Sequence, residues 1–382
     1  MKMEPVTHFL TGACLARAGF NRKAAYATLA MTLAAEMPDL DTLWSIGGPI
    51  AGFEHHRGIT HTLIGLPFEG LALVGAIWVL HRVRVRRSEL HAAQQPAATG
   101  PAAEGAIVRP LTAAPVRWAS LYGFAMIALL SHILLDWTNN YGVRPFFPFN
   151  SHWYAGSFVF IFEPVMFVLL LAGLLAPPLF GLVAGEVGAR RPTFRGRGWA
   201  IFALVSIAAL WGWRIVERNN AIQLASNATY GPTDAPSAEV LRLTASPYPV
   251  NPFRWHTIVE TPAFYQMATA DTLHSTLASD PAQDLFYKPP ATPAIETAKQ
   301  SRLGRAYLDW ASWPVVTEAG PAAPVHATPH TPDWNSVAFR DLRFMYDTPL
   351  LRGRENPPLS AIVYLDATGH VARMELGGRA QE

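Results

Sequence analysis

Long apolar segments crowd into the first 216 residues of this chain, and they constrain its fold more than any other feature. A helix that spans a bilayer needs about 20 mostly apolar residues. Four stretches meet that requirement: residues 63–80, 119–137, 158–182 and 199–215. The sequence therefore predicts an α-helical integral membrane domain with four clear spans, the third of which can break near Pro177 and Pro178.

The composition agrees with a membrane protein. Only 15% of the 382 residues are charged, against about 25% in an average soluble protein. Buried helices of a soluble bundle are the alternative, but they do not explain why basic residues flank the apolar runs. A net charge of +2 creates no broad field for nucleic acid, so no nucleic-acid partner is expected. The single cysteine, Cys14, excludes an intrachain disulfide framework and a Cys-rich zinc site.

Two shorter apolar helices are expected before the first span, at residues 6–18 and 23–36. Each is short for a full crossing, so they form either a re-entrant pair or two thin, tilted spans. Residues 1–5 contain one Lys, and no small-residue cleavage site follows a proper apolar region. We therefore expect no cleaved signal peptide and a retained N-terminus.

Lys and Arg residues in short loops predict the orientation. One basic loop follows the first span, a second separates the third span from the fourth, and the tip between the two short helices is also basic. The residues are Arg82, Arg84, Arg86 and Arg87; Arg190, Arg191, Arg195 and Arg197; and Arg17, Arg22 and Lys23. These loops are expected on the cytoplasmic side. Alternation then places residues 37–62, 136–157 and everything after 216 on the outer side.

The chain divides into three parts. Residues 1–87 and 118–216 form the membrane domain, and the Ala/Pro/Gly-rich residues 88–117 form a disordered cytoplasmic loop. Residues 217–382 are predicted to be a small extracytoplasmic α+β domain with a mostly antiparallel sheet.

Within the soluble domain, strand-like patterns and one amphipathic helix stand out. The strand-like runs are His256–Ala270, Val337–Tyr346, Ala361–Asp366 and His370–Leu376, and the helix is Ala298–Asp309. The last two runs flank a predicted hairpin turn. The histidines of this domain show no ligand spacing and are interpreted as surface residues.

Metal-type ligands gather in the outer-side segments of the membrane domain. His132 and Asp136 are four residues apart on a predicted helix, so they share one face in the last turn of an apolar span. The other members are His8; Glu36, Asp39 and Asp41; and Glu54, His55, His56 and His61. Imidazole and carboxylate together are the donors of zinc and manganese sites. The sequence thus predicts a divalent metal site, holding one or two ions of zinc or manganese.

Each residue of this group also has a structural interpretation. Asp39 and Asp41 can be turn residues where Pro38 ends a helix, and His55 and His56 can be interfacial polar residues. The His132–Asp136 pair can be a hydrogen bond between helices.

Several motifs, in order, resemble the bacterial YdjM-type membrane-bound metal-dependent hydrolases. They are THFLTGA, the E-x-P-D-x-D block, HHRGITHT and HILLDWTNNYGVRPFFPF, and they lie within residues 5–165. The family is distantly similar to zinc-dependent phospholipase C and single-strand-specific nucleases. The resemblance implies a multi-pass protein of the bacterial inner membrane with a hydrolytic metal site. It implies the metal ligands His8, Asp39, His61, His132 and Asp136, to which the residue pattern adds His56.

A second His-x-x-x-Asp/Glu pair, present in those enzymes, is missing here. His152 and Glu163 come nearest, but their spacing is wrong. This difference favours one or two metal ions over three. Glu163, in an apolar run, is a further candidate ligand or histidine partner.

The hypothesis for the reaction is hydrolysis of a phosphoester, small or lipid-linked, by metal-activated water. Asp136 is the candidate shared ligand, and Asp41 and Glu36 are candidate bases. Arg57 and Arg144 are candidate phosphate clamps, each of which can instead be an interfacial anchor. The partners expected are membrane lipids and this phosphoester substrate.

Two non-catalytic functions stay open. The site can hold a structural or transported metal ion, or the membrane domain can serve as an anchor for an extracytoplasmic binding domain. Ligands gathered near one surface favour the hydrolase over a transporter, which needs ligands at mid-span. The oligomeric state is left open.

Overall fold

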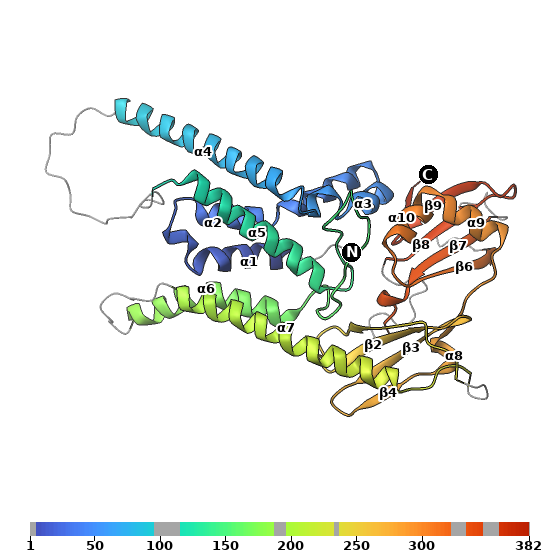
Figure 1. Cartoon of the computed structure of the whole chain (residues 1–382). Helices are drawn as coiled ribbons and strands as arrows, with labels where there is room; N and C mark the ends of the chain where they lie inside the picture. The colour runs from blue at the N-terminus through green and yellow to red at the C-terminus, as the bar shows by residue number, and fades with distance from the viewer. Residues whose placement is uncertain are drawn as a thin grey trace.

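The computed structural model describes residues 5–94, 115–186, 196–232, 237–321, 334–346 and 359–381. In Figure 1, helices from the first part of the chain form an elongated bundle, and strands from the last part lie at one end of it. The predicted order, apolar helices followed by an antiparallel sheet domain, is confirmed.

Helices make up the first part of the described chain. The α-helices are α1 (Pro5–Arg17), α2 (Ala27–Ala34), α3 (Pro49–His55), α4 (Leu66–Gln94), α5 (Trp118–Thr138), α6 (Pro164–Glu186) and α7 (Arg197–Ser226). Three 3₁₀ segments connect them: η1 (Phe20–Arg22), η2 (Met37–Gly47) and η3 (Ile59–His61).

Among the described residues, three helices are long and apolar enough to cross a membrane: Leu66–Leu90 of α4, α5, and α7. The prediction of four spans is not confirmed, because residues 158–163 are not helical and the apolar helix Pro164–Phe180 is shorter than the others. Proline disfavours a helical residue before it and suits the first helical position, which explains why α6 begins at Pro164. The expected break is not seen, because α6 continues through Pro177 and Pro178.

Two helices extend past the predicted boundaries. Helix α4 continues to Gln94, so the start of the predicted loop 88–117 is helical, while residues 95–114 lie outside the described residues. Helix α7 continues past residue 216 to Ser226, and its last turns pack against the first sheet. Helix α7 therefore extends from the apolar bundle to the first sheet.

Helix α5 is the central helix of the bundle. In its apolar window 44% of the residues are buried, against 22% in α4 and in α7. It packs against α1, α2 and α4, and its buried residues belong to the largest apolar cluster of this region. The helix that carries His132 and Asp136 is thus the most buried of the three candidate spans.

Gly12 lets α1 and α2 approach closely. A Cβ at this position would lie 2.5 Å from the Met31 carbonyl oxygen and 2.8 Å from the Ala35 Cβ. Small residues at helix contacts permit this kind of backbone approach in membrane proteins. The approach brings His8, one turn before Gly12, and the Ala35 carbonyl to the same end of the bundle.

The ends of the long helices fall into two groups. In Figure 1, the ends of α4, α5, α6 and α7 that border residues 95–117 and 187–196 lie away from the sheets. The start of α4, the end of α5 and the start of α6 lie toward the sheets. The candidate ligands and the C-terminal domain are therefore at the same end of the bundle.

The C-terminal part contains two five-stranded antiparallel sheets, not one small sheet. The first has the order β1-β2-β3-β4, with β5 also paired to β3, and the second has the order β10-β9-β8-β7-β6. The strands of the first sheet are β1 (Arg242–Pro247), β2 (Arg254–Glu260), β3 (Phe264–Asp271), β4 (Thr276–Ala278) and β5 (Leu285–Tyr287). Those of the second are β6 (Pro314–Pro321), β7 (Asn335–Asp341), β8 (Ala361–Leu365), β9 (Val371–Leu376) and β10 (Arg379–Gln381).

The helical elements of this part are short. They are α8 (Pro281–Asp284), α9 (Pro293–Gln300), α10 (Arg302–Trp310) and η4 (Leu342–Phe344). The predicted run His256–Ala270 is split into β2 and β3, and the predicted helix Ala298–Asp309 is split at Ser301, whose side chain caps α10. The predicted hairpin between β8 and β9 is confirmed.

His256 contradicts the interpretation of the tail histidines as surface residues. It lies on β2 with 2% of its surface exposed, and its Nε2 donates to the Leu342 carbonyl oxygen at 2.9 Å. Burial lowers the pKa of His256 to about 4. His326 and His330 lie outside the described residues.

Candidate metal centre

Helix α5 supplies the first two donors. His132 and Asp136 lie four residues apart, both side chains are fully buried, and His132 Nε2 lies 3.5 Å from Asp136 Oδ2. An ionisable pair enclosed in an apolar helix is costly unless partners compensate it. Their predicted common face is confirmed.

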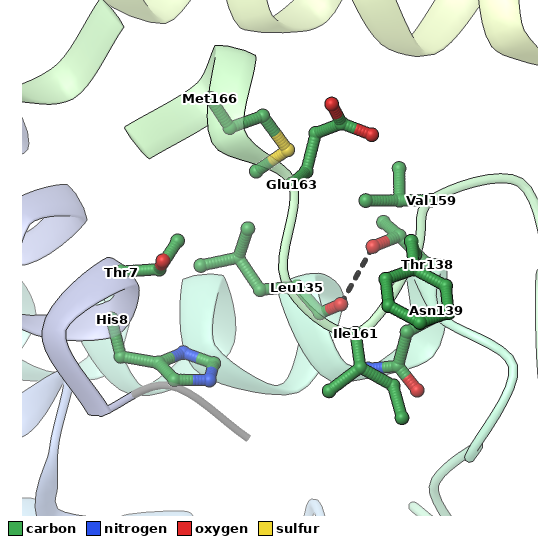
Figure 2. Close-up of a pocket in the computed structure, with 10 residues that line it drawn as sticks. Thr7, His8, Leu135, Thr138, Asn139, Val159, Ile161, Glu163 and Met166 are labelled. Carbon is green, nitrogen blue, oxygen red and sulfur yellow. Dashed lines mark hydrogen bonds between the residues drawn. The ribbon is translucent and has the colours of Figure 1, made fainter. Parts of the chain in front are cut away.

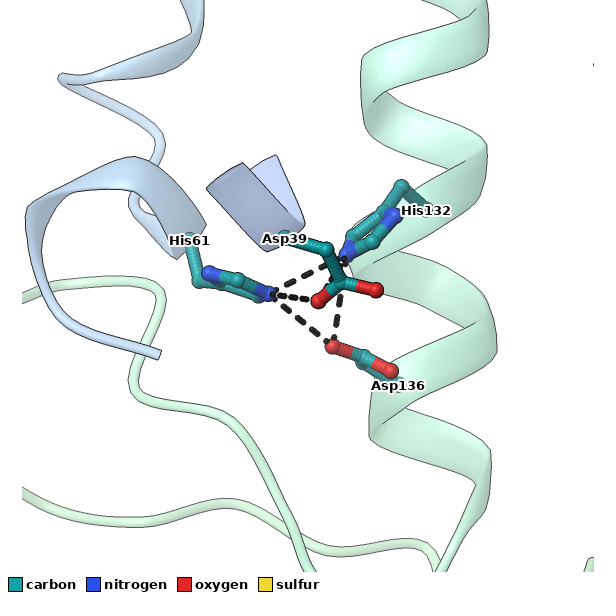
Figure 3. A group of neighbouring side chains, drawn as sticks. All are labelled: Asp39, His61, His132 and Asp136. Carbon is teal, nitrogen blue, oxygen red and sulfur yellow. Dashed lines mark hydrogen bonds and ion pairs between the residues drawn. The ribbon is translucent and has the colours of Figure 1, made fainter. Parts of the chain in front are cut away.

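Two further donors come from the 3₁₀ segments that precede α4. His61 ends η3, and Asp39 lies in the first turn of η2. His61 Nε2 is 3.4 Å from Asp39 Oδ1, 3.3 Å from Asp136 Oδ2 and 3.1 Å from His132 Nε2. Figure 3 shows the four side chains converging, and their ligand atoms lie within 4.8 Å of one another.

The partners of the Nδ1 atoms fix both histidine tautomers. His132 Nδ1 lies 2.7 Å from the Ala35 carbonyl oxygen, which can only accept, so Nδ1 donates. His61 Nδ1 lies 3.3 Å from Asp41 Oδ2 and 3.1 Å from the Thr60 hydroxyl, which itself donates to Asp41. In the neutral rings, both Nε2 atoms therefore carry lone pairs. This arrangement of a histidine held through its second nitrogen is typical of metal ligands.

The centre of the cluster consequently contains acceptors without a donor between them. Two Nε2 lone pairs and the carboxylates of Asp39 and Asp136 face one another, so either a metal ion or a proton must balance them. Without a metal, burial opposes a charge on His61, but hydrogen bonds to Asp136, Asp39 and Asp41 raise its pKa well above the usual value. The donor set fits a divalent metal ion that prefers nitrogen and oxygen ligands.

His8 lies beside this cluster, as predicted. Its ring stacks on His132 with centroids 3.9 Å apart, and its Nε2 is 3.5 Å from Asp136 Oδ1. The ring is buried, and neither of its nitrogens has a hydrogen-bond partner among the described residues. A buried imidazole of this kind is suited to a further ligand role.

A small cavity adjoins His8, and Figure 2 shows Glu163 on its far side. Its volume of about 20 Å³ is enough for one water molecule. Glu163 is bound to the buried guanidinium of Arg214 and does not join the His/Asp cluster. Glu163 was predicted to be a further metal ligand or the partner of a histidine. In the structure its partner is an arginine instead. His152 is exposed, and within the described part of the chain it bonds neither with Glu163 nor with the His/Asp cluster.

A second group of possible ligands consists of Asp39, Asp41 and His56. Asp39 belongs to both groups, so the geometry makes Asp39 the ligand that two metal ions could share. The sequence had suggested Asp136 for this role. His56 Nδ1 is 3.0 Å from Asp41 Oδ1, and 18% of the His56 side chain is exposed. Two neighbouring groups with a common carboxylate are compatible with one or two ions.

Asp41 supports the cluster rather than facing it as a base. It accepts the backbone N–H of Arg57 at 2.6 Å in addition to the bonds with His56, His61 and Thr60. Burial opposes its charge, but the bonds from the two histidines hold the pKa of Asp41 well below its usual range. A carboxylate with this many donors is a weak base, so the predicted base role is not favoured.

Arg57 is fully buried, which argues against the predicted role of a phosphate clamp. Its guanidinium donates to Asp136 Oδ1 at 2.7 Å and to the Gly142 carbonyl at 2.5 Å, and it stacks on the Tyr141 ring. Its backbone has φ 53°, a left-handed conformation that costs about 1 kcal/mol for a non-glycine residue. In this conformation the main chain reaches Asp41 and the side chain reaches Asp136.

Arg144 and Glu36 lie at the edges of the cluster. Arg144 is mostly buried, donates to Asp309 Oδ2 of α10 at 2.9 Å, and also reaches the main chain at Arg57 and Glu54. Burial, and next the charge of Asp39, raise the pKa of Glu36 to about 7. One oxygen of Glu36 is buried without a hydrogen-bond partner among the described residues. Glu36 therefore stays the better of the two predicted bases.

Sequence reasoning missed the loop that supports the site. The Asn139 side chain accepts the backbone N–H groups of Tyr141 and Gly142, and this turn aims the Gly142 carbonyl at Arg57. Gly142 has φ 86°, which glycine adopts readily. The motif N-N-Y-G was a turn signal that could have indicated this role.

Comparison with known proteins assigns the chain to a family. Residues 3–221 match the YdjM inner membrane protein family, which is more than half of the chain, and the chain belongs to this family. The protein is also similar to the uncharacterized protein YfhP of Bacillus subtilis (strain 168), with 22% identity over 180 residues. The match covers 45% of this chain and 45% of YfhP. No solved structure matches the chain.

Proposed function

We propose that this member of the YdjM inner membrane protein family is a membrane-bound metal-dependent hydrolase that cleaves a phosphoester, small or lipid-linked. The observation that carries the proposal is the cluster of two Nε2 lone pairs and two carboxylates within 4.8 Å of one another. The relation to zinc-dependent phospholipase C, suggested by the motifs, is part of the proposal.

The ligands we propose are Asp39, His61, His132 and Asp136, with His8 and His56 at the two sides of the cluster. Zinc suits this nitrogen and oxygen set, and manganese is the second choice. When bound, a divalent ion would supply Lewis-acid polarisation of a phosphoryl oxygen and activation of water at neutral pH. One or two ions are proposed, with Asp39 shared if there are two.

The surrounding residues would hold the ligands and move protons. Arg57 fixes one oxygen of Asp136, and Asp41 fixes the ring of His61. Such outer contacts orient metal ligands and raise their basicity. Glu36, with a buried oxygen without a described partner, is our candidate for accepting a proton near neutral pH.

We propose a multi-pass protein of the bacterial inner membrane, with the site and the C-terminal domain on the outer side. The family name and the three candidate spans support the membrane location. Basic residues support the sidedness, because Arg82, Arg84, Arg86 and Arg87 lie in the second half of α4 and Arg197 begins α7, and these helix ends lie away from the sheets (Figure 1).

A structural or transported metal ion is the second candidate function. A transporter needs ligands near mid-span and access from both sides. Here the ligands lie at the end of α5, toward the soluble domain, which favours hydrolysis.

Metal content tests the proposal. We expect one or two zinc or manganese ions per chain, by elemental mass spectrometry of detergent-purified protein. His132→Ala and Asp136→Asn should reduce that number, whereas His274→Ala, an exposed histidine outside the site, should not. Hydrolysis of bis-p-nitrophenyl phosphate should follow the metal content. Wild-type protein without metal after reloading would refute the metal site, and metal-loaded protein inactive on a panel of phosphodiesters and phospholipids would refute the hydrolase.

A further inference from the structure

A cavity of about 430 Å³ lies between the metal cluster and the soluble domain. Asp41 and Thr60 line it, and both contact His61 of the cluster. The opposite side is formed by α10, which contributes Arg305 and Asp309. Ligand sites often occur at domain boundaries of this kind, and this one is of a size that holds a small molecule or a headgroup.

The lining combines aromatic rings with two guanidinium groups. Trp44, Trp153 and Trp310 contribute apolar walls, and Arg144 and Arg305 contribute positive charge. Arginine binds phosphate in a bidentate manner and also stacks on aromatic rings. The chemistry suits an anion attached to an apolar group.

The carboxylates Glu54 and Asp309 in the lining already have arginine partners. Arg305 is the cation of the lining that can bind a ligand. Glu54 binds Arg302, and Asp309 binds Arg144. Arg305 is exposed, and within the described ranges its bond is to the Gln300 carbonyl at the end of α9, at 3.0 Å. Arg305 therefore has most of its donors free for a ligand.

Exposed apolar side chains of η2 and η3 lie in the cavity lining and next to it in the sequence. Trp44 and Ile59 line the cavity and have 56% and 52% of their surface exposed. Leu43 and Ile46, on the same 3₁₀ segment as Trp44, are 62% and 87% exposed. Exposed apolar side chains in one patch mark a contact with lipid or ligand. An acyl or prenyl chain could thus stay in lipid while the headgroup enters the cavity.

We propose that this cavity binds the phosphate end of an amphiphilic phosphoester, and that Arg305 of the soluble domain is a specificity-determining residue. Asp309 occupies Arg144 in the structure, so the ligand phosphate would compete with this carboxylate for Arg144. The inference rests on the proposed function for its choice of phosphate. It makes the soluble domain a part of the site rather than a separate binding module.

Binding measured without metal tests this inference apart from hydrolysis. The full chain, in dodecyl maltoside micelles and EDTA, is titrated with hexyl phosphate, inorganic phosphate or hexanol, and tryptophan fluorescence reports on the cavity. We expect hexyl phosphate to bind more tightly than either of the other two. Arg305→Gln should weaken it about tenfold, which corresponds to about 1.4 kcal/mol, and Asp309→Asn should strengthen it. Lys299→Gln, the same charge change on the neighbouring helix α9, should have no effect.

The outcomes separate the two proposals. Equal binding of inorganic and hexyl phosphate would refute the amphiphilic ligand, and wild-type affinity in Arg305→Gln would refute the role of the soluble domain. Either result can occur in a protein that binds metal and hydrolyses phosphodiesters. Conversely, hexyl phosphate binding that depends on Arg305, in a protein without metal or hydrolysis, would uphold the cavity and refute only the proposed function.

Discussion

Replacing Arg57 with glutamine should destabilise the metal-free protein strongly. The guanidinium and the Asp136 carboxylate are 2.7 Å apart, with 1% and 0% of their side chains exposed. Removal of the guanidinium leaves the buried Asp136 carboxylate with only the neighbouring histidines as partners. Breaking a buried ion pair in this way costs about 3–5 kcal/mol. The lost bond to the Gly142 carbonyl adds to this effect. We therefore expect the free energy of unfolding to fall by an amount in this range.

The matched control is Arg302→Gln, which removes the same group from an exposed pair. Arg302 and Glu54 lie 2.7 Å apart, but 43% and 38% of their side chains are exposed. Pairs of this kind contribute about 0–1 kcal/mol. The contrast between the two variants compares a buried arginine with an exposed one at the same ion-pair distance and with the same chemical change, and the bond of Arg57 to Gly142 adds to the difference.

Unfolding by SDS in mixed micelles, followed by tryptophan fluorescence with EDTA present, measures both variants. A difference of less than about 1 kcal/mol between them would refute the reasoning, because the buried pair would then be no more costly to break than an exposed one. Preserved stability combined with lost phosphate binding would instead restore Arg57 as a phosphate clamp.

Three further predictions follow from the same structure. Zinc at 100 times its dissociation constant should stabilise the wild type by about 2.7 kcal/mol, and EDTA should remove this gain; no shift in the SDS midpoint would count against a metal site in the folded state. Between pH 7 and pH 5, His256 takes up a proton in the unfolded state but not in the folded state, because burial lowers its pKa in the fold. The free energy of unfolding should therefore fall by about 2 kcal/mol more in the wild type than in His256→Gln. Equal pH profiles of the two proteins would show that His256 is not held neutral. Gly12→Ala should cost about 1–3 kcal/mol and weaken zinc binding, because the new Cβ meets the Met31 carbonyl. Gly123→Ala, in open space on α5, is its control, and equal effects of the two substitutions would contradict the close contact of α1 with α2.

The membrane helices could be predicted because their signal is local. Apolar length alone identifies α4, α5 and α7. The same criterion failed at residues 158–163, where the composition is apolar but the chain is not helical. These residues pack on the loop after α5: backbone N–H groups of Ser157, Phe158 and Val159 donate to carbonyls of Thr138 and Asn139. A tertiary contact of this kind produces no periodic pattern of apolar residues, so the sequence does not reveal it.

The candidate ligands could be predicted from the sequence, but the roles of the two arginines near them could not. Residue type and helical spacing were enough to select His132 and Asp136. The difference between Arg57, which is buried, and Arg144, which lines a cavity, depends on where the chain turns. Both residues lie within the motifs, Arg57 after His56 and Arg144 after Val143, so the sequence did not distinguish them. The φ of 53° at Arg57 directs its side chain inward, and no sequence pattern indicates a left-handed arginine.

The support of the cluster continues into the soluble domain through the loop after α5. The Gly142 carbonyl holds Arg57, the Tyr141 carbonyl accepts the Trp310 Nε1–H at 3.2 Å, and the Asn140 carbonyl accepts from the buried Arg343 at 2.7 Å. Three successive carbonyls thus connect the guanidinium behind Asp136 with α10 and η4.

A separate binding module would not need these contacts, since its function would be independent of the geometry at the end of α5. Buried charged hydrogen bonds are costly to leave unmade, so movement of the soluble domain away from this loop would also disturb the position of Arg57. The membrane domain and the soluble domain are therefore best understood as one unit around a common site.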